Sequence, residues 1–492
     1  MSDTISNKQK EENFPIPEDK IVQTNHTITI DGKPLDYTAT TGTIVLKEES
    51  EKDEKVEGEK AKASIFFVAY TKDGVDDSAE RPITFAFNGG PGSSSVWLHL
   101  GLLGPKRVHM DDTKILPPPY KLVANENSLL DITDLVFIDP VSTGFSRAVP
   151  GEKPTEFHNF DKDIESVGDF IRLYTTRYQR WNSPKFLAGE SYGTTRSAGL
   201  SGYLQTRHGM YLNGIMLISS ILNFQTANFT NGNDLPYILF LPTYAATAWY
   251  HQQLDDDLQA DLKVTLAEVE AFALGEYTVA LMQGSTLPAS EQKAIAAKLA
   301  RYTGLSVDYI QKTNLRIDIY RFTKELLREQ GKTVGRLDTR FTGIDKDTAG
   351  EHFEFDPSYA AIQGPYTAVL NDYIRRDLAF ANDISYEILA NLYETWGYPK
   401  FENKFVDVAE TLRQAMSINP HLKVLVAGGY YDLATPYLAT RYTFNHLGLD
   451  ASLQENIVMT YYAAGHMMYV HPPSMAQLKE DLKRFVKTAV GD

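Results

Sequence analysis

The chain has 492 residues, of which 42% are hydrophobic, and this supplies enough material for a large core. Its formal net charge of −16 at pH 7 argues against nucleic acid or an anionic membrane surface as a partner. Because the chain contains no cysteine, disulfides, thiolate metal sites and thiol catalysis are excluded.

Residues 1–21 are predominantly polar and charged, and they predict a flexible tail. The first residues lack the apolar segment of a signal peptide or a membrane anchor. No uninterrupted apolar run elsewhere approaches the length that spans a bilayer. These features predict a cytoplasmic protein with no membrane contact.

The first structured region, from His26 to Tyr70, has a β pattern. Residues 27–30 and 35–40 predict two strands joined by a turn at Asp31-Gly32, and two further strands follow at 42–46 and 63–70. Between the latter two, alternating charges and a near absence of apolar residues predict a solvated, mobile hairpin loop at 47–62.

Strands and helices then alternate, which is typical of a mostly parallel sheet. Predicted buried strands follow one another along the chain at 82–87, 134–139, 184–188, 214–219, 422–428 and 456–462. A helix-rich segment at 226–384 interrupts this rhythm, and it includes a polar, irregular stretch at 331–357. We therefore expect a tail at 1–21, a core at 22–225, a helix-rich cap insertion at 226–384 and the rest of the core at 385–492.

The sequence G-E-S-Y-G at 189–193 matches the G-x-S-x-G nucleophile elbow of α/β-hydrolases, in which a serine lies on a tight turn between a strand and a helix. Its surroundings fit this context, because the apolar stretch at 184–188 precedes it and apolar residues recur at helical spacing over 194–205. The sequence therefore predicts an α/β-hydrolase fold, with Ser191 as the nucleophile.

A serine nucleophile needs a base, and the base needs a group that orients it. In this fold the acid and then the histidine follow the serine, in loops after late strands. Asp432 follows the predicted strand 422–428 and His466 follows 456–462, so we predict that Asp432 orients His466. The alternative for Asp432 is a turn or cap aspartate ahead of Pro436.

The glycine-rich turn at 88–92 supplies a candidate oxyanion site. Acyl transfer requires preorganised N–H donors, one from the residue after the nucleophile and one from the loop after an early strand. Tyr192 fits the first description and Gly90 the second, because a residue without a Cβ lets its N–H approach the substrate closely. The alternative is that this stretch is simply a tight turn.

Four motifs together resemble the serine carboxypeptidases, a family of α/β-hydrolases. They are N-G-G-P-G-S-S-S at 88–95, D-P-V-S-T-G-F-S at 139–146, G-E-S-Y-G at 189–193 and G-H-M at 465–467. Ser93 stands where eukaryotic members usually have cysteine, so the chain resembles bacterial, disulfide-free members. The resemblance implies removal of C-terminal residues from peptides, without a metal or an organic cofactor.

The resemblance also implies a site for the terminal carboxylate of the substrate, formed by Asn88 and Glu190. In the family a second glutamate precedes the Leu-Gly-Pro found here at 103–105, but this chain has Leu102 there. Two carboxyl groups in contact raise the pKa of one of them, so an unpaired Glu190 is expected to ionise at lower pH than a paired one. Arg196 on the elbow helix is a candidate substitute cation, but we expect it instead to lie on the helix surface or in a structural salt bridge.

These observations predict a serine exopeptidase that acts on peptides through an acyl-enzyme. The alternatives within the resemblance are an acyltransferase, an esterase and a cyanohydrin lyase, and the alternative of another class is a non-catalytic peptide-binding protein. We expect peptidase activity to persist at pH 7, limited on the acid side by protonation of His466. The sequence leaves the oligomeric state open.

Overall fold

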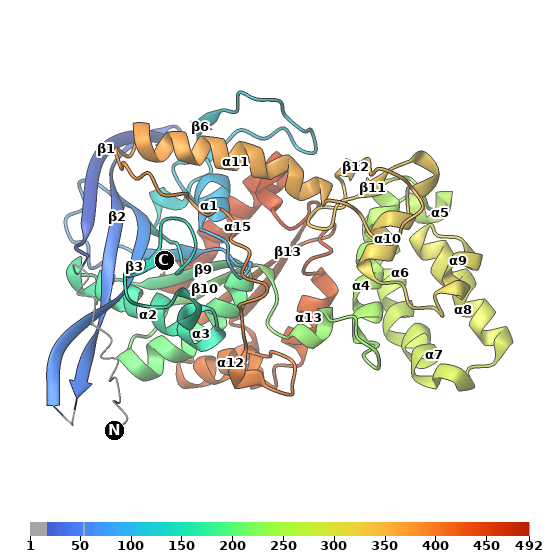
Figure 1. Cartoon of the computed structure of the whole chain (residues 1–492). Helices are drawn as coiled ribbons and strands as arrows, with labels where there is room; N and C mark the ends of the chain where they lie inside the picture. Colours follow the sequence, from blue (N-terminus) through green and yellow to red (C-terminus); the bar gives the residue numbers. More distant parts are fainter. Residues whose placement is uncertain (1–16, 53–54, 492) are drawn as a thin grey trace, which may run out of the picture.

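A computed structural model describes residues 17–52 and 55–491 of the chain, and its centre is a ten-stranded sheet (Figure 1). The strand order is β1-β2-β3-β7-β4-β9-β10-β13-β14, and β8 pairs with β3 beside this path. The strands of this sheet are β1 (Lys20–Ile30), β2 (Lys33–Lys52), β3 (Lys55–Lys72), β4 (Ile83–Phe87), β7 (Asp134–Ile138), β8 (Arg147–Ala148), β9 (Lys185–Ser191), β10 (Gly214–Ser220), β13 (Lys423–Gly429) and β14 (Ile457–Tyr462).

The first strands form long antiparallel hairpins at one side of the sheet (Figure 1). Strand β1 begins at Lys20, inside the segment predicted as a tail, and residues 1–16 of that prediction lie outside the described residues. The turn between β1 and β2 lies where the sequence predicts it, since Ile30 pairs with Lys33.

The predicted mobile loop at 47–62 is wrong, because β2 and β3 continue through most of it. Charged residues of opposite sign face each other across this ribbon: Lys47 lies 3.3 Å from Glu59, and Lys62 lies 3.6 Å from Glu48. Cross-strand pairs of this kind stabilise a solvated hairpin without apolar contacts. Alternating charge therefore marks an exposed ribbon here, whose tip at 53–54 lies outside the described residues.

In the order of the sheet, the six strands β7-β4-β9-β10-β13-β14 are parallel, as predicted. Of these, β4, β7 and β10 are buried along their whole length. Helices cover both faces of the sheet, with α2, α3 and α12 on one face and α1, α11 and α15 on the other (Figure 1). Parallel strands buried on both sides by helices form the α/β core that the sequence predicts. The helices of the core are α1 (Val96–Leu98), α2 (Phe160–Arg177), α3 (Tyr192–His208), α11 (Pro357–Arg376), α12 (Ala409–Ile418), α13 (Tyr437–Asn445), α14 (Ala451–Gln454) and α15 (Pro472–Val490).

Between β10 and β13, a group of helices forms a separate hydrophobic cluster beside the carboxyl ends of the strands (Figure 1). This group comprises α4 (Leu235–Tyr250), α5 (Asp256–Gln259), α6 (Leu262–Phe272), α7 (Thr278–Gln283), α8 (Ala289–Thr303), α9 (Val307–Lys312) and α10 (Ile319–Glu325). Helix α11 belongs to the same predicted insertion, yet its Tyr366, Leu370 and Tyr373 pack into the core of the sheet.

Two small antiparallel ribbons complete the described secondary structure. One pairs β5 (Lys106–Val108) with β6 (Leu122–Ala124), and the other pairs β11 (Thr333–Val334) with β12 (Thr342–Gly343). The second ribbon frames a short loop that reaches the functional site. No helix in the described part of the chain is both long and apolar enough to cross a membrane.

Candidate active site

Ser191 lies at the junction of β9 and α3, on the strand–turn–helix that the sequence predicts. Its backbone has φ 61° and ψ −130°, a conformation that is rare for a residue with a side chain. Close packing of the backbone explains the glycines on either side: a Cβ on Gly189 would lie 2.2 Å from the carbonyl oxygen of Gly193. The elbow therefore holds Ser191 in a strained, fixed position at the edge of a large cavity.

Asp432 and His466 follow β13 and β14, and the structure brings them together. The Nδ1 atom of His466 lies 2.8 Å from Oδ2 of Asp432, and both side chains are buried. Oδ1 of Asp432 accepts hydrogen bonds from the backbone N–H groups of Ala434 and Thr435, at 2.7 and 3.0 Å. Asp432 is therefore both the predicted partner of His466 and the alternative turn-capping aspartate, because Oδ2 faces the histidine while Oδ1 caps a turn.

Electrostatic coupling changes the pKa of both partners. Burial by itself raises the pKa of Asp432, but the His466 charge and several hydrogen bonds outweigh it, so the pKa lies below its usual value. Burial by itself lowers the pKa of His466, but the Asp432 carboxylate outweighs it, so the pKa lies above 6.5. The pair thus favours an ionised Asp432 beside a strongly basic His466.

The glycine-rich turn after β4 packs directly against the elbow. A Cβ on Gly89 would lie 2.4 Å from the backbone nitrogen of Tyr192, so this position accepts no side chain without a shift of the backbone. Gly90, the next residue, has φ +100°, which favours glycine, and it lines the cavity. The close approach of Gly89 to Tyr192 therefore brings the next residue, Gly90, near the first turn of α3. This is the position expected for the two predicted oxyanion donors, Gly90 and Tyr192.

Glu190 is buried beside the nucleophile and accepts two hydrogen bonds from neutral donors. Asn88 Nδ2 donates to its Oε1 at 2.9 Å, and the Tyr469 hydroxyl donates to its Oε2 at 2.7 Å. Burial raises the pKa of Glu190 to about 7, despite the opposing charge of His466. The missing second carboxyl group therefore does not return the pKa of Glu190 to its ordinary value, because burial, and to a smaller extent the charge of Asp432, keep that pKa raised.

Leu102 does not face Glu190 as a replacement partner, because its side chain belongs to the hydrophobic core. It lies in one turn of π-helix at His99–Leu103. The ring of Tyr469 packs against this turn, since a Cβ on Gly101 would lie 2.3 Å from it. Tyr469, which follows His466 in the chain, thus packs against the turn where the family carries its second glutamate, and its hydroxyl reaches Glu190.

Arg196 forms the structural salt bridge that the sequence analysis favours over a role in substrate binding. Its side chain is 1% exposed, and its Nε lies 2.8 Å from Oδ2 of Asp163. Its Nη1 donates to the backbone carbonyl of Asn88 at 2.5 Å. Arg196 therefore supports the glycine-rich turn from behind and does not line the cavity.

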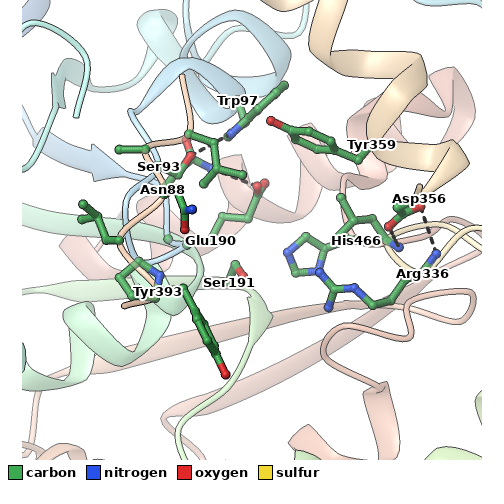
Figure 2. A pocket seen from close by; sticks show the side chains of 18 of the residues that line it. Asn88, Ser93, Trp97, Glu190, Ser191, Arg336, Asp356, Tyr359, Tyr393 and His466 are labelled. Atoms are coloured by element: carbon green, nitrogen blue, oxygen red, sulfur yellow. Dashed lines mark hydrogen bonds between the residues drawn. The ribbon is translucent and has the colours of Figure 1, made fainter. Parts of the chain in front are cut away.

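The cavity has a volume of about 1160 Å³, and several of its walls come from the insertion and from the segment after it (Figure 2). Sequence analysis missed these residues, because no motif marks them. The aromatic side chains that line the cavity are Trp97, Tyr320, Phe353, Tyr359, Tyr393, Trp396 and Tyr398. In the described residues, no group of three His, Asp or Glu side chains is arranged to hold a metal ion.

A short loop between β11 and β12, here called the bracket (residues 336–339), joins the insertion to both the Asp432 and the His466 loops. The carbonyl of Arg336 accepts from the N–H of Leu433 at 3.0 Å, and the carbonyl of Leu337 accepts from the N–H of His466 at 2.7 Å. Asp338 Oδ2 also accepts from the N–H of Gly465 at 3.2 Å. The predicted irregular loop is therefore the part of the insertion that hydrogen-bonds to both the Asp432 and the His466 loops.

One known protein family matches most of this chain. The family model described as serine carboxypeptidase matches residues 55–478. The chain belongs to the serine carboxypeptidase family.

Among curated relatives, the pheromone-processing carboxypeptidase KEX1 of Saccharomyces cerevisiae is 36% identical over 134 residues, covering 26% of this chain and 17% of the relative. The serine carboxypeptidase ctsa-3.1 of Caenorhabditis elegans is 26% identical over 208 residues, covering 40% of this chain and 33% of the relative. These alignments span less than half of each relative's length.

Among solved structures, the yeast KEX1 carboxypeptidase superposes with a TM-score of 0.58 at 15% identity, covering 92% of this chain and 91% of that one. This likeness confirms the predicted α/β-hydrolase fold. It shows the fold alone.

Proposed function

We propose that this member of the family is a serine-type carboxypeptidase, which removes C-terminal residues from peptides through an acyl-enzyme. The observation that carries the proposal is the buried hydrogen bond between His466 and Asp432, on the same cavity as the strained elbow of Ser191. Figure 2 shows the Ser191 side chain and the His466 ring facing the same space. This arrangement suits nucleophilic catalysis on a carbonyl group.

In the proposed reaction, Ser191 Oγ attacks the scissile carbonyl while His466 Nε2 takes its proton. Asp432 holds the imidazole in the correct tautomer and stabilises the imidazolium. The N–H groups of Gly90 and Tyr192 stabilise the oxyanion. His466 then returns the proton to the leaving nitrogen as the C–N bond breaks, and a water molecule, activated by His466, releases the acyl group from Ser191.

Asn88 and Glu190 form the proposed site for the end of the peptide. Below a pH of about 7, Glu190 is largely protonated, so it can donate its O–H to the terminal carboxylate of a substrate. Above that pH the ionised Glu190 repels this carboxylate. A working range near neutral pH follows, and it is compatible with a cytoplasmic location, which stays a prediction.

Replacing Ser191 by alanine tests the proposal. We expect Ser191→Ala to lose several orders of magnitude in kcat while its melting temperature is retained, because members of a triad act as a unit. The control is Ser201→Ala, since Ser201 lies on the same helix outside the cavity and donates to the carbonyl of Ala198. Mass spectrometry of a peptide mixture then identifies the products.

Each outcome of this experiment selects one function. Peptides shortened from the C-terminus support a carboxypeptidase, whereas ester cleavage without peptide cleavage favours an esterase. Transfer of the acyl group to an added alcohol in preference to water favours an acyltransferase. A separate labelling experiment with an organophosphonate tests the remaining alternative. If Ser191 is not labelled, a non-catalytic binding protein is supported.

A further inference from the structure

The strongest unassigned group on the cavity is Arg336, the first residue of the bracket. Of the described residues that line the cavity, it is the one arginine or lysine. Figure 2 shows its side chain reaching toward the ring of His466. The two are close enough that the charge of Arg336 opposes protonation of His466. A cation therefore lies beside the catalytic histidine without a role in the proposed proton transfers.

Backbone contacts fix the position of Arg336. Its carbonyl accepts from Leu433 N–H, and its own N–H donates to Oδ1 of Asp356 at 3.1 Å. The neighbouring Leu337 contacts the His466 backbone through its carbonyl. These contacts hold the backbone from which the Arg336 side chain extends along the cavity wall.

The guanidinium of Arg336 has no ion-pair partner among the described carboxylates within 4.0 Å. Asp356 also lines the cavity, but its oxygens accept from the backbone N–H groups of Arg336 and Leu337, and it caps α11 through Ser358. Glu190 is held by Asn88 and Tyr469. The positive charge of Arg336 is therefore available to a substrate.

We propose that Arg336 binds a carboxylate of the peptide substrate and supplies a positive charge there, which neither Asn88 nor Glu190 can supply. A guanidinium matches a carboxylate with two parallel hydrogen bonds, and the pair is strengthened by partial burial. The terminal carboxylate is separated from the scissile carbonyl by two atoms only, the leaving nitrogen and Cα. His466 must contact that nitrogen, so a cation beside His466 lies close to the end of the peptide.

This inference rests on the proposed function, and an acidic side chain at the last residue is a second source of the same carboxylate. The test therefore measures binding and not turnover, in the Ser191→Ala background. N-acetylated dipeptides with neutral side chains are titrated by calorimetry at pH 7, as free acids and as C-terminal amides. A second pair compares glutamate with glutamine as the last residue, both as amides.

We expect the further change Arg336→Gln to raise the Kd of the free acid about 10- to 100-fold, the range for a hydrogen bond to a charged group, and to leave the Kd of its amide unchanged. Arg336→Lys should give an intermediate Kd, since it keeps the charge and loses the fork. The matched control is Arg376→Gln, which removes the same charge from an exposed position on α11 outside the cavity. An unchanged melting temperature shows that the fold is intact.

If Arg336→Gln weakens only the amide that ends in glutamate, the carboxylate bound by Arg336 belongs to the side chain. Equal changes for all four ligands, no change for any, or failure of every ligand to bind at millimolar concentration would overturn the inference. These results are distinct from a failure of the proposed function, which would appear as intact peptides after incubation with the wild-type protein.

Discussion

Glu190 and Asp432 are both buried at the active site and near His466, yet their pKa values move in opposite directions. The pKa of Glu190 is raised to about 7, whereas that of Asp432 lies below its usual value. Burial raises both, so burial does not distinguish them. The difference lies in what each carboxyl group contacts.

Asp432 accepts hydrogen bonds from two backbone N–H groups and from the Thr435 hydroxyl, and it pairs directly with His466. Glu190 accepts from one amide and one phenol. At Asp432, the larger number of donors and the direct cationic partner lower the pKa more than desolvation raises it. At Glu190, the two neutral donors lower the pKa less than desolvation raises it. One site thus provides a permanent anion to orient a base and a weak acid that remains able to donate a proton.

Of the changes to these two carboxyl groups and their contacts, removing the charge of Asp432 should lower activity the most. We expect Asp432→Asn to lower kcat about 10⁴-fold on esters and peptides alike, because the imidazolium loses its anionic partner and His466 its tautomer. Steady-state kinetics at the pH optimum measure this. Asp450→Asn is the control, since Asp450 caps α14 at an exposed site where asparagine also caps well. A loss below 10-fold would exclude Asp432 as the acid of the triad.

Replacing Glu190 should change the pH profile more than the maximal rate. For a peptide with a free C-terminus, wild-type kcat/KM should decrease on the acid side as His466 becomes protonated, because its pKa is raised above the usual 6.5. It should also decrease on the alkaline side, as pH rises through about 7 and Glu190 ionises. We expect Glu190→Gln to abolish the alkaline limb, because glutamine stays neutral. It should also move the acid limb to lower pH, because an ionised Glu190 raises the pKa of His466.

A substrate without a terminal carboxylate provides the control for this profile. An ester or a peptide amide should show no alkaline limb attributable to Glu190 in the wild-type enzyme. The interpretation is contradicted if Glu190→Gln retains the same alkaline limb as the wild type. A single optimum near pH 5 in the wild type would likewise contradict it.

The smallest expected effect comes from Tyr469. Its hydroxyl lowers the pKa of Glu190 by donating to the carboxylate, so Tyr469→Phe should raise that pKa. We expect the alkaline limb to move to higher pH by less than about one unit, which a kcat/KM profile resolves. Tyr462→Phe is the control, since the Tyr462 hydroxyl donates to Asp481 outside the cavity. A shift to lower pH would show that Tyr469 does not stabilise the ionised form.

The parts of the site that lie on the parallel sheet could be predicted from the sequence. Ser191, Asp432 and His466 each follow a strand with a clear apolar pattern, and the fold fixes their order. The raised pKa of Glu190 could not be predicted from the absence of a partner, because it depends on burial in three dimensions. Arg336 could not be found at all, because its role depends on where an irregular loop contacts the core.

One charge pattern formed a different structure than expected, and one expected salt bridge has a partner that the sequence did not identify, because charge alone does not specify a location. The alternating charges at 47–62 form cross-strand ion pairs instead of a loop. Arg196 pairs with the buried Asp163, a contact between helices that sequence spacing does not reveal. In both cases an ion pair determines where the charged side chain lies, and the partner in that pair can be identified only from the fold.

The bracket joins two separate loops through backbone hydrogen bonds. The amide protons of Leu433, Gly465 and His466 are each hydrogen-bonded to an oxygen of the bracket. A fluctuation that lifts the bracket away from the core exposes all three at once, so their exchange with solvent deuterium should follow one opening free energy. We therefore expect opening of the bracket to limit amide exchange in both the Asp432 loop and the His466 loop.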